Sequence, residues 1–254
     1  MLLVAVGCGG SGDEAADVAG ADSLDTSHGN AMIEEYLEDQ VRSIEGRWSE
    51  RAAERTAWTS RRPERVRRLR EMLGLMPWPE RGPLQVTVTD TIRGEGYRVE
   101  MLHFQSVPNL YVTANLYVPT DVEGPRPTVL YVTGHASEEG PDGRPLGSKA
   151  AYQRHPAWYA RHGYVALTFD TIQLGEIDGV HHGTYRHGRW WWYNRGYNPL
   201  GVEVWNGMRA IDLLEDRPEV DAGRIGVTGR SGGGAYAWFH AALDDRVAVS
   251  VPTA

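Results

Sequence analysis

The second half of the chain alternates between strand and helix patterns, and this alternation limits the folds open to it. Residues 127–134 form a near-continuous apolar run, as a strand buried on both faces requires. Helical spacing and shorter apolar runs then follow in turn, with helices expected over 150–162, 201–215 and 232–243 and strands over 164–170, 224–229 and 247–252. Alternating strands and helices build a parallel sheet with helices on both faces. The sequence therefore predicts an α/β fold.

The region before this alternation has two other patterns. Stretches rich in β-formers over 84–90, 96–104 and 110–118 predict short antiparallel strands at the entry to the sheet. Further upstream, apolar residues at helical spacing predict a helix over 31–57. A second helix is expected from Pro63 to Gly74, because proline suits a first helical turn and glycine the end of a helix.

Three parts are therefore expected along the chain. Residues 1–30 hold no aromatic residue and many Gly, Ala, Ser and Asp, which predicts a flexible tether. Residues 31–76 form a helical segment, and residues 77–254 form the α/β domain. We expect this domain to be incomplete at its C-terminus.

Composition excludes several protein classes. The chain has 254 residues, 41% of them hydrophobic, which is enough for one large core. Its apolar runs stay well below the roughly 20 residues that a membrane-spanning helix needs. A single cysteine, Cys8, excludes a disulfide scaffold. The net charge of −8 argues against general nucleic-acid binding, so the arginine-rich stretch 61–70 is interpreted as a solvated helix face.

The N-terminus resembles a bacterial lipoprotein signal. A short apolar stretch ends in small residues directly before Cys8, where lipid would anchor the protein without a spanning helix. No Lys or Arg precedes this stretch and only seven residues precede Cys8, so we expect the start codon to lie further upstream. A disordered N-terminus with an incidental cysteine is the alternative.

Chemistry is most clearly indicated by the pentapeptide GRSGG, which spans Gly229 to Gly233. It follows a buried strand directly and opens a helix directly, as a nucleophile elbow does. Such a turn strains the backbone of the serine and raises its hydroxyl above the sheet. Ser231 is therefore the candidate nucleophile, and the amide of Gly232 at the helix N-terminus is a candidate oxyanion donor. The alternative is a glycine-rich connection with a surface serine.

A second oxyanion donor is expected after the first long parallel strand. Thr133 and Gly134 end that strand, which makes the backbone amide of His135 or Ala136 the candidate. A simple turn at Gly134 and His135 is the alternative.

The sequence resembles a known family around this motif. The stretch RPEVDAGRIGVTGRSGGGAYAWFHAALDDRV is similar to the elbow region of the acetyl xylan esterase-like α/β-hydrolases, and the similarity extends over about residues 84–254. This resemblance implies an α/β-hydrolase fold and a serine esterase that removes acyl groups, often from carbohydrate. It does not fix the substrate.

The other two members of a catalytic triad are not expected within the chain. In this fold the order is Ser, then Asp or Glu, then His, and only 23 residues follow Ser231. Asp244 and Asp245 come too early for the acid, and His240 lies within the elbow helix. The loop histidines His181, His182 and His187 are an alternative source of a base or of a metal site, although their spacing is typical of neither.

A loop rich in aromatic residues precedes the helix at 201–215. Its aromatic side chains either stack on sugar rings or pack the loop against the domain, and the sequence leaves both interpretations open. The candidates for substrate binding are Tyr185, Trp190, Trp191 and Trp192. Asp170 ends a parallel strand where sites form, and we expect it to organise this loop. Glu176 and Asp178 are expected to form hydrogen bonds within the loop.

Together these features predict a serine ester hydrolase that removes acyl groups, with acetyl favoured, from a small-molecule or polysaccharide ester. No cofactor, metal or nucleic acid is expected. A peptidase of the same fold and a non-catalytic binding or scaffold lipoprotein remain alternatives. The expected location is the bacterial cell envelope or periplasm, with secretion as the second possibility.

Overall fold

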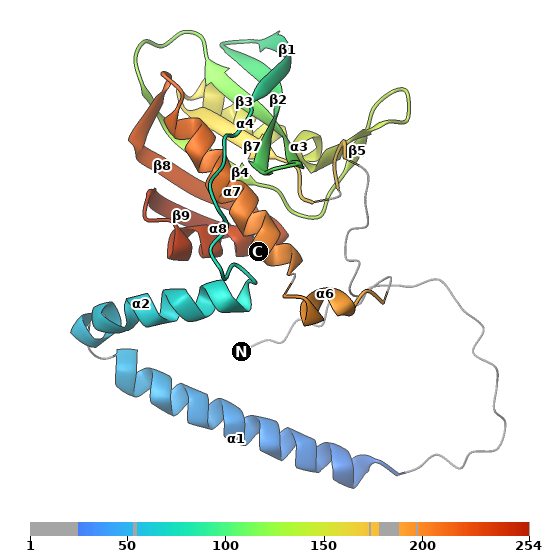
Figure 1. The fold of residues 1–254 in the computed structure, drawn as a ribbon, viewed down its shortest axis with the longest axis vertical. Helices are drawn as coiled ribbons and strands as arrows, with labels where there is room; N and C mark the ends of the chain where they lie inside the picture. Colours follow the sequence, from blue (N-terminus) through green and yellow to red (C-terminus); the bar gives the residue numbers. More distant parts are fainter. Residues whose placement is uncertain (1–24, 53–54, 173, 178–187, 197, 254) are drawn as a thin grey trace, which may run out of the picture. The chain divides into compact units, whose positions relative to one another are not determined.

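A computed structural model describes residues 25–52, 55–172, 174–177, 188–196 and 198–253 (Figure 1). The chain divides into two compact units, Met1–Arg61 and Arg62–Ala254. Within the described residues no helix is both long enough and apolar enough to cross a membrane. Cys8 lies outside the described residues.

The first unit contains helix α1, Ser27–Ala52, and the start of α2, Arg55–Met72. Helix α1 begins at Ser27, so residues 27–30 are helical and do not belong to a tether. The apolar stripe that predicted α1 is half-exposed along its length, at Ile33, Leu37, Val41, Ile44 and Trp48. Periodicity therefore located this helix although its apolar face is not buried.

The expected start of the second helix at Pro63 is wrong, because α2 runs through this residue from Arg55. Proline is tolerated there although it cannot donate a backbone hydrogen bond to the preceding turn. Within the second unit, Val66 and Leu69 pack against the main core, and Leu73 is buried in it. The end of this helix is therefore anchored in the core by its apolar side chains.

The second unit is built on a seven-stranded sheet in the order β1-β2-β3-β7-β4-β8-β9. Its strands are β1 Thr87–Gly94, β2 Tyr97–Val107, β3 Leu110–Pro119, β4 Arg126–Val132, β7 Val165–Phe169, β8 Val220–Arg230 and β9 Val247–Thr253. The first three strands pair antiparallel, β3 joins β7 antiparallel, and β7, β4, β8 and β9 pair in parallel. The predicted α/β fold, with antiparallel entry strands, is confirmed.

Helices cover both faces of this sheet (Figure 1). Helices α7, Pro199–Glu215, and α8, Gly232–Leu243, contribute to the large core together with one face of the strands. Helix α4, Arg154–Arg161, packs on the other face with Val99, Tyr117 and Ala166. Neighbouring residues of β3 point to opposite sides, since Leu116 belongs to the first core and Tyr117 to the second, as strand geometry requires.

Three local features differ from the prediction or were not predicted. The helix expected over 150–162 is two short helices, α3 Gly147–Ala151 and α4, separated by a turn. A two-stranded hairpin of β5, Glu138–Glu139, and β6, Pro145–Leu146, precedes α3. The short helix α6, Trp191–Asn194, precedes α7, whose start is capped where the Asn198 side chain accepts a hydrogen bond from the Leu200 amide at 2.9 Å.

Candidate active site

Ser231 lies in the turn between the end of β8 and the start of α8, with its side chain exposed. Its backbone has φ 59° and ψ −123°, so the predicted backbone strain is confirmed. A non-glycine residue in this region is strained and persists only where its surroundings hold it. The Ser231 amide donates to the Thr253 carbonyl at 2.9 Å, and the Ser231 carbonyl accepts from the Ala235 amide at 3.2 Å, which fixes the turn from both sides.

Glycines around Ser231 allow the backbone to pack more closely than any other residue would permit. A Cβ on Gly229 would lie 2.3 Å from the Val132 carbonyl oxygen, and one on Gly233 would lie 2.0 Å from the same atom. A Cβ on Gly234 would lie 2.1 Å from the Thr253 carbonyl oxygen. The ends of β4 and β9 therefore press directly against the elbow.

The loop over residues 133–136, which we call the oxyanion loop, lies beside Ser231 as predicted. A Cβ on Gly134 would lie 2.6 Å from the Arg230 carbonyl oxygen and 3.2 Å from Ser231 Cβ. The Ala136 amide donates to the Gly134 carbonyl at 3.0 Å, so the loop itself engages one of the two amides proposed as oxyanion donors.

The side chain of His135 was not anticipated at this site. Its ring lies against the first turn of α8. A Cβ on Gly232 would be only 2.9 Å from the His135 Cε1 atom. Sequence reasoning considered only the backbone of His135. Its position directly after a strand that ends at the site was the available signal.

A buried ion pair lies on the other side of the oxyanion loop. Lys149 in α3 is 3% exposed, and its ammonium contacts Asp170 Oδ2 at 2.6 Å and Glu176 Oε1 at 2.8 Å. Asp170 Oδ1 accepts the Lys149 backbone amide at 2.9 Å, and Oδ2 also accepts the Thr113 hydroxyl at 2.6 Å. Asp170 therefore joins α3 to the start of the loop after β7, where Gly175 packs against it. Glu176, which was expected to bond within that loop, bonds Lys149 of α3 instead.

Hydroxyl groups connect this ion pair to the oxyanion loop. Thr133 Oγ1 lies 2.9 Å from Ser148 Oγ, 3.0 Å from Thr171 Oγ1 and 3.0 Å from the Phe169 carbonyl oxygen. The Thr171 amide donates to Ser148 Oγ at 2.9 Å. All three hydroxyl residues are buried, at 2% exposure or less.

A second carboxyl, Glu203 in α7, is fully buried below the loop that follows β7. It accepts the backbone amide of Ile172, while its other oxygen has no hydrogen-bond partner among the described residues. Burial raises the pKa of Glu203 to about 8, with a smaller contribution from the nearby charge of Asp170 and against the opposing effect of the Ile172 amide. Glu203 therefore holds its proton at neutral pH.

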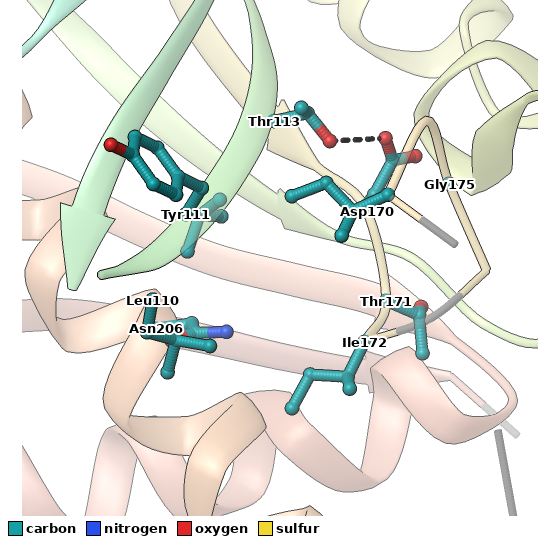
Figure 2. Close-up of a pocket in the computed structure, with 10 residues that line it drawn as sticks. Leu110, Tyr111, Thr113, Asp170, Thr171, Ile172, Gly175 and Asn206 are labelled. Carbon is teal, nitrogen blue, oxygen red and sulfur yellow. Dashed lines mark hydrogen bonds between the residues drawn. The ribbon is translucent and has the colours of Figure 1, made fainter. Parts of the chain in front are cut away.

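A small cavity of about 130 Å³ opens beside the same loop (Figure 2). Figure 2 shows the Thr113 hydroxyl bonded to Asp170, with Ile172 and Asn206 on the opposite side of the opening. Leu110, Val112 and Ile177 supply apolar wall, and Thr171 lines the cavity while also contacting Thr133. The cavity therefore borders the hydroxyl cluster next to the oxyanion loop.

The remaining predicted residues are not brought to this site by the described contacts. Trp190 and Trp191 are about half-exposed, and the Arg195 guanidinium lies 5.5 Å above the Trp191 ring. The rings of Trp191 and Trp192 contact each other edge to face, with their centroids 6.0 Å apart. The predicted residues Asp178, His181, His182, Tyr185 and His187 lie outside the described residues.

His240 is held within the core, as its place in the elbow helix predicts. It is fully buried, and its Nδ1 lies 2.7 Å from the Tyr236 carbonyl oxygen. Its Nε2 lies where a Cβ on Gly207 would sit, at 1.9 Å. Burial lowers the pKa of His240, so this imidazole is neutral and packs between α7 and α8.

Comparisons with known proteins agree with this geometry. Residues 148–254 match the profile of the family described as "Glucuronyl esterase, fungi". A Bacillus subtilis (strain 168) protein, YtaP, which is named as a hydrolase, is 29% identical over 198 residues, covering 75% of this chain and 63% of that protein. Both matches are to proteins described as an esterase or a hydrolase, in agreement with the resemblance to the acetyl xylan esterase-like α/β-hydrolases.

Solved structures of esterases share the fold of this chain. The methylesterase BT1017 matches with a TM-score of 0.63 and 24% identity, over 82% of this chain and 44% of that one. A glucuronoyl esterase from Solibacter usitatus matches with a TM-score of 0.53 and 21% identity, over 76% and 57%. An acetyl xylan esterase from Paenibacillus sp. R4 matches with a TM-score of 0.51 and 20% identity, over 67% and 54%. The chain thus spans about half the length of these solved esterases.

Proposed function

We propose that this protein is a serine ester hydrolase that forms an acyl-enzyme on Ser231. The observation that carries the proposal is the strained, exposed Ser231 at the start of α8 with the oxyanion loop packed against it. Attack of Ser231 Oγ on the ester carbonyl places negative charge on the carbonyl oxygen. The amides of Gly232 and of His135 or Ala136 are the donors proposed to bind that oxyanion. The leaving alcohol takes up a proton, and water then releases the acid.

A serine hydroxyl needs a base to take its proton, because it is a weak nucleophile at neutral pH. His240 does not serve, since it is buried and bonded within α8. We place the catalytic acid and histidine outside these 254 residues, following the Ser, acid, His order of the fold. On this proposal, the 254-residue chain hydrolyses esters poorly, retaining about 10³–10⁴-fold acceleration over water from its oxyanion site and binding alone.

His135 offers a direct test of that proposal, because its ring lies against Gly232. If the His135 imidazole is the base, His135→Ala removes activity that the 254-residue chain already has. If the base comes from elsewhere, a product of the gene that extends past residue 254 is the active form. In that form His135→Ala leaves the ionisation that controls kcat in place.

An ester of a carbohydrate is the substrate class that we propose, with acetyl as the acyl group. The support is the similarity to proteins named as acetyl xylan esterase, glucuronoyl esterase and methylesterase. Trp190, Trp191, Trp192 and Tyr185 are proposed to stack on sugar rings, since exposed aromatic faces bind the apolar faces of sugars. A lipid on Cys8 is proposed to hold the protein at the bacterial cell envelope.

The test uses a fluorophosphonate probe and two esters, an acetylated xylo-oligosaccharide and a methyl ester of glucuronic acid. In a form of the protein that includes the catalytic acid and histidine, we expect labelling and hydrolysis of the acetyl ester, both abolished by Ser231→Ala. Ser250→Ala is the matched control, because this hydroxyl on β9 donates to the Ala237 carbonyl of α8 at 2.9 Å. Labelling that survives Ser231→Ala would disprove the proposal. Preference for the glucuronate ester would keep Ser231 and change the substrate.

A further inference from the structure

The oxyanion loop is attached to the protein from two sides, and only one of them belongs to the nucleophile elbow. On the elbow side, Gly134 packs against the Arg230 carbonyl and Ser231. On the other side, the Thr133 hydroxyl contacts the end of β7, Thr171 and α3. The Thr171 hydroxyl also lies 3.4 Å from the carbonyl oxygens of Thr133 and Gly134. The direction of the Gly134–His135 peptide therefore depends on how these two hydroxyls are held.

The Thr133 hydroxyl can satisfy all its contacts in one arrangement. A hydroxyl has one hydrogen to donate and two lone pairs to accept with. Phe169 offers only a carbonyl, so Thr133 donates to it at 3.0 Å. Thr133 must then accept from Ser148 and from Thr171, at 2.9 and 3.0 Å. Thr171 is therefore a donor to the residue that begins the oxyanion loop.

The position of Thr171 is fixed by the buried ion pair next to it in the chain. Asp170 receives Lys149 through both the side-chain ammonium, at 2.6 Å, and the backbone amide, at 2.9 Å. Glycines at 147 and 175 let the chain close around this carboxylate, because a Cβ on either would lie within 2.4 Å of it. Asp170 therefore has little freedom to move. Thr171 is the next residue in the chain, so its backbone is held in place as well.

We propose that Thr171, held by the Asp170–Lys149 pair, is a positioning residue that aligns the oxyanion loop through Thr133. Thr171 does not touch the reacting atoms; it sets where the peptide after Thr133 points. This inference rests on the proposed function in one respect only, namely that the loop binds an oxyanion. The coupling between Thr171 and the loop can be measured without any substrate.

The decisive variant is Thr171→Val, which keeps the shape of the side chain and removes its hydroxyl. Thr128→Val is the matched control: Thr128 lies on β4, is 1% exposed, and its hydroxyl bonds the Arg126 carbonyl at 3.1 Å, far along the strand from the loop. Thr171→Ser restores the hydroxyl. All three variants are made in the form of the protein that shows ester hydrolysis, or in the 254-residue chain if neither form does.

The first measurement is amide hydrogen exchange of a peptide that contains residues 133–136. We expect Thr171→Val to speed this exchange at least about tenfold, and Thr128→Val and Thr171→Ser to leave it near the wild-type rate. The second measurement is steady-state hydrolysis. A misplaced oxyanion donor lowers kcat by about 10- to 100-fold with KM nearly unchanged, because the donor acts mainly on the transition state.

The outcomes separate the two proposals. Exchange that is equal in Thr171→Val and Thr128→Val overturns the positioning role, whether or not the protein is an esterase. Faster exchange with an unchanged kcat also overturns it, since the loop would then move without consequence for the oxyanion. Absence of both hydrolysis and probe labelling in a form that includes the catalytic acid and histidine overturns the proposed function, while the exchange comparison still decides whether Thr171 holds the loop.

Discussion

The two sides of the candidate oxyanion site are held by different kinds of interaction. The elbow side is fixed by backbone packing, in which Gly229 and Gly233 press against the Val132 carbonyl. The opposite side is fixed by charge, in the buried pair of Lys149 and Asp170 and the hydroxyl groups around it. Both sides meet at the loop over residues 133–136.

This difference determines what each side tolerates. Close backbone packing accepts no additional atom, but it does not depend on the protonation state of a side chain. A buried ion pair accepts small changes in shape, but the loss of one partner leaves a charge without compensation in a medium of low polarity. The elbow side should therefore respond to added methyl groups, and the charged side to lost charges.

The largest expected effect is on the charged side. Lys149→Met should lower the free energy of unfolding by about 3–5 kcal/mol, because it leaves Asp170 buried and unpaired. Chemical denaturation measures this loss. The double variant Lys149→Met/Asp170→Asn should recover part of the loss by removing the remaining charge. Arg144→Ala, which breaks an ion pair whose members are 84% and 61% exposed, should cost less than about 1 kcal/mol. Equal losses in Lys149→Met and Arg144→Ala would contradict the comparison.

On the elbow side, Gly233→Ala should lower the free energy of unfolding by about 3 kcal/mol, since the new methyl group would lie 2.0 Å from the Val132 carbonyl oxygen. Gly223→Ala is the control in the adjoining strand β8, where the nearest atom to a Cβ is Asp221 Oδ1 at 3.4 Å. Thermal unfolding of the two variants gives the difference. A Gly233→Ala protein as stable as Gly223→Ala would show that the elbow is not tightly packed.

The same difference explains what the sequence could predict. The elbow is local: strand, GRSGG and helix are consecutive, so Ser231 and its strained backbone could be predicted from one short stretch. The oxyanion loop could be placed because strand order in an α/β sheet brings the end of β4 beside β8. Periodicity also located most helices and strands to within a few residues.

The charged side could not be predicted in the same way. Lys149 and Asp170 are 21 residues apart. No rule of sequence spacing pairs a lysine in one helix with a carboxylate that follows the next strand. Sequence reasoning noted Asp170 at the end of its strand, but gave no partner for it. The one signal was that Lys149 is the only lysine in a chain that otherwise uses arginine. The burial of Glu203 likewise could not be predicted from the sequence, because it depends on how α7 packs under the loop after β7.

The pH dependence of stability should separate the two sides further. The usual pKa of a glutamate is 4.5, and that of Glu203 in the folded protein is raised to about 8. The folded protein keeps this proton while the unfolded chain releases it, so the contribution of Glu203 is fully favourable below pH 4.5. It is lost as the pH rises towards 8, at up to about 1.4 kcal/mol per pH unit.

Glu203→Gln tests this expectation, because a glutamine resembles the protonated carboxyl and can still accept the Ile172 amide. The stability of Glu203→Gln relative to wild type should increase from pH 5 to pH 8. Urea denaturation at several pH values measures this change. A constant difference between the two proteins across that range would show that Glu203 is ionised in the folded state.

The smallest expected change concerns Gly232, and it defines where the close packing of the elbow ends. A Cβ on Gly232 would approach no backbone atom and meets only the His135 ring, at 2.9 Å from Cε1. That ring can turn away, and alanine favours the helix that begins here by up to about 1 kcal/mol over glycine. Gly232→Ala should therefore change the free energy of unfolding by less than about 1 kcal/mol, against the large loss in Gly233→Ala. The displaced ring makes this variant informative for catalysis as well: unchanged kcat would exclude the His135 imidazole as a working part of the site, whereas a fall in kcat without loss of stability would assign it one.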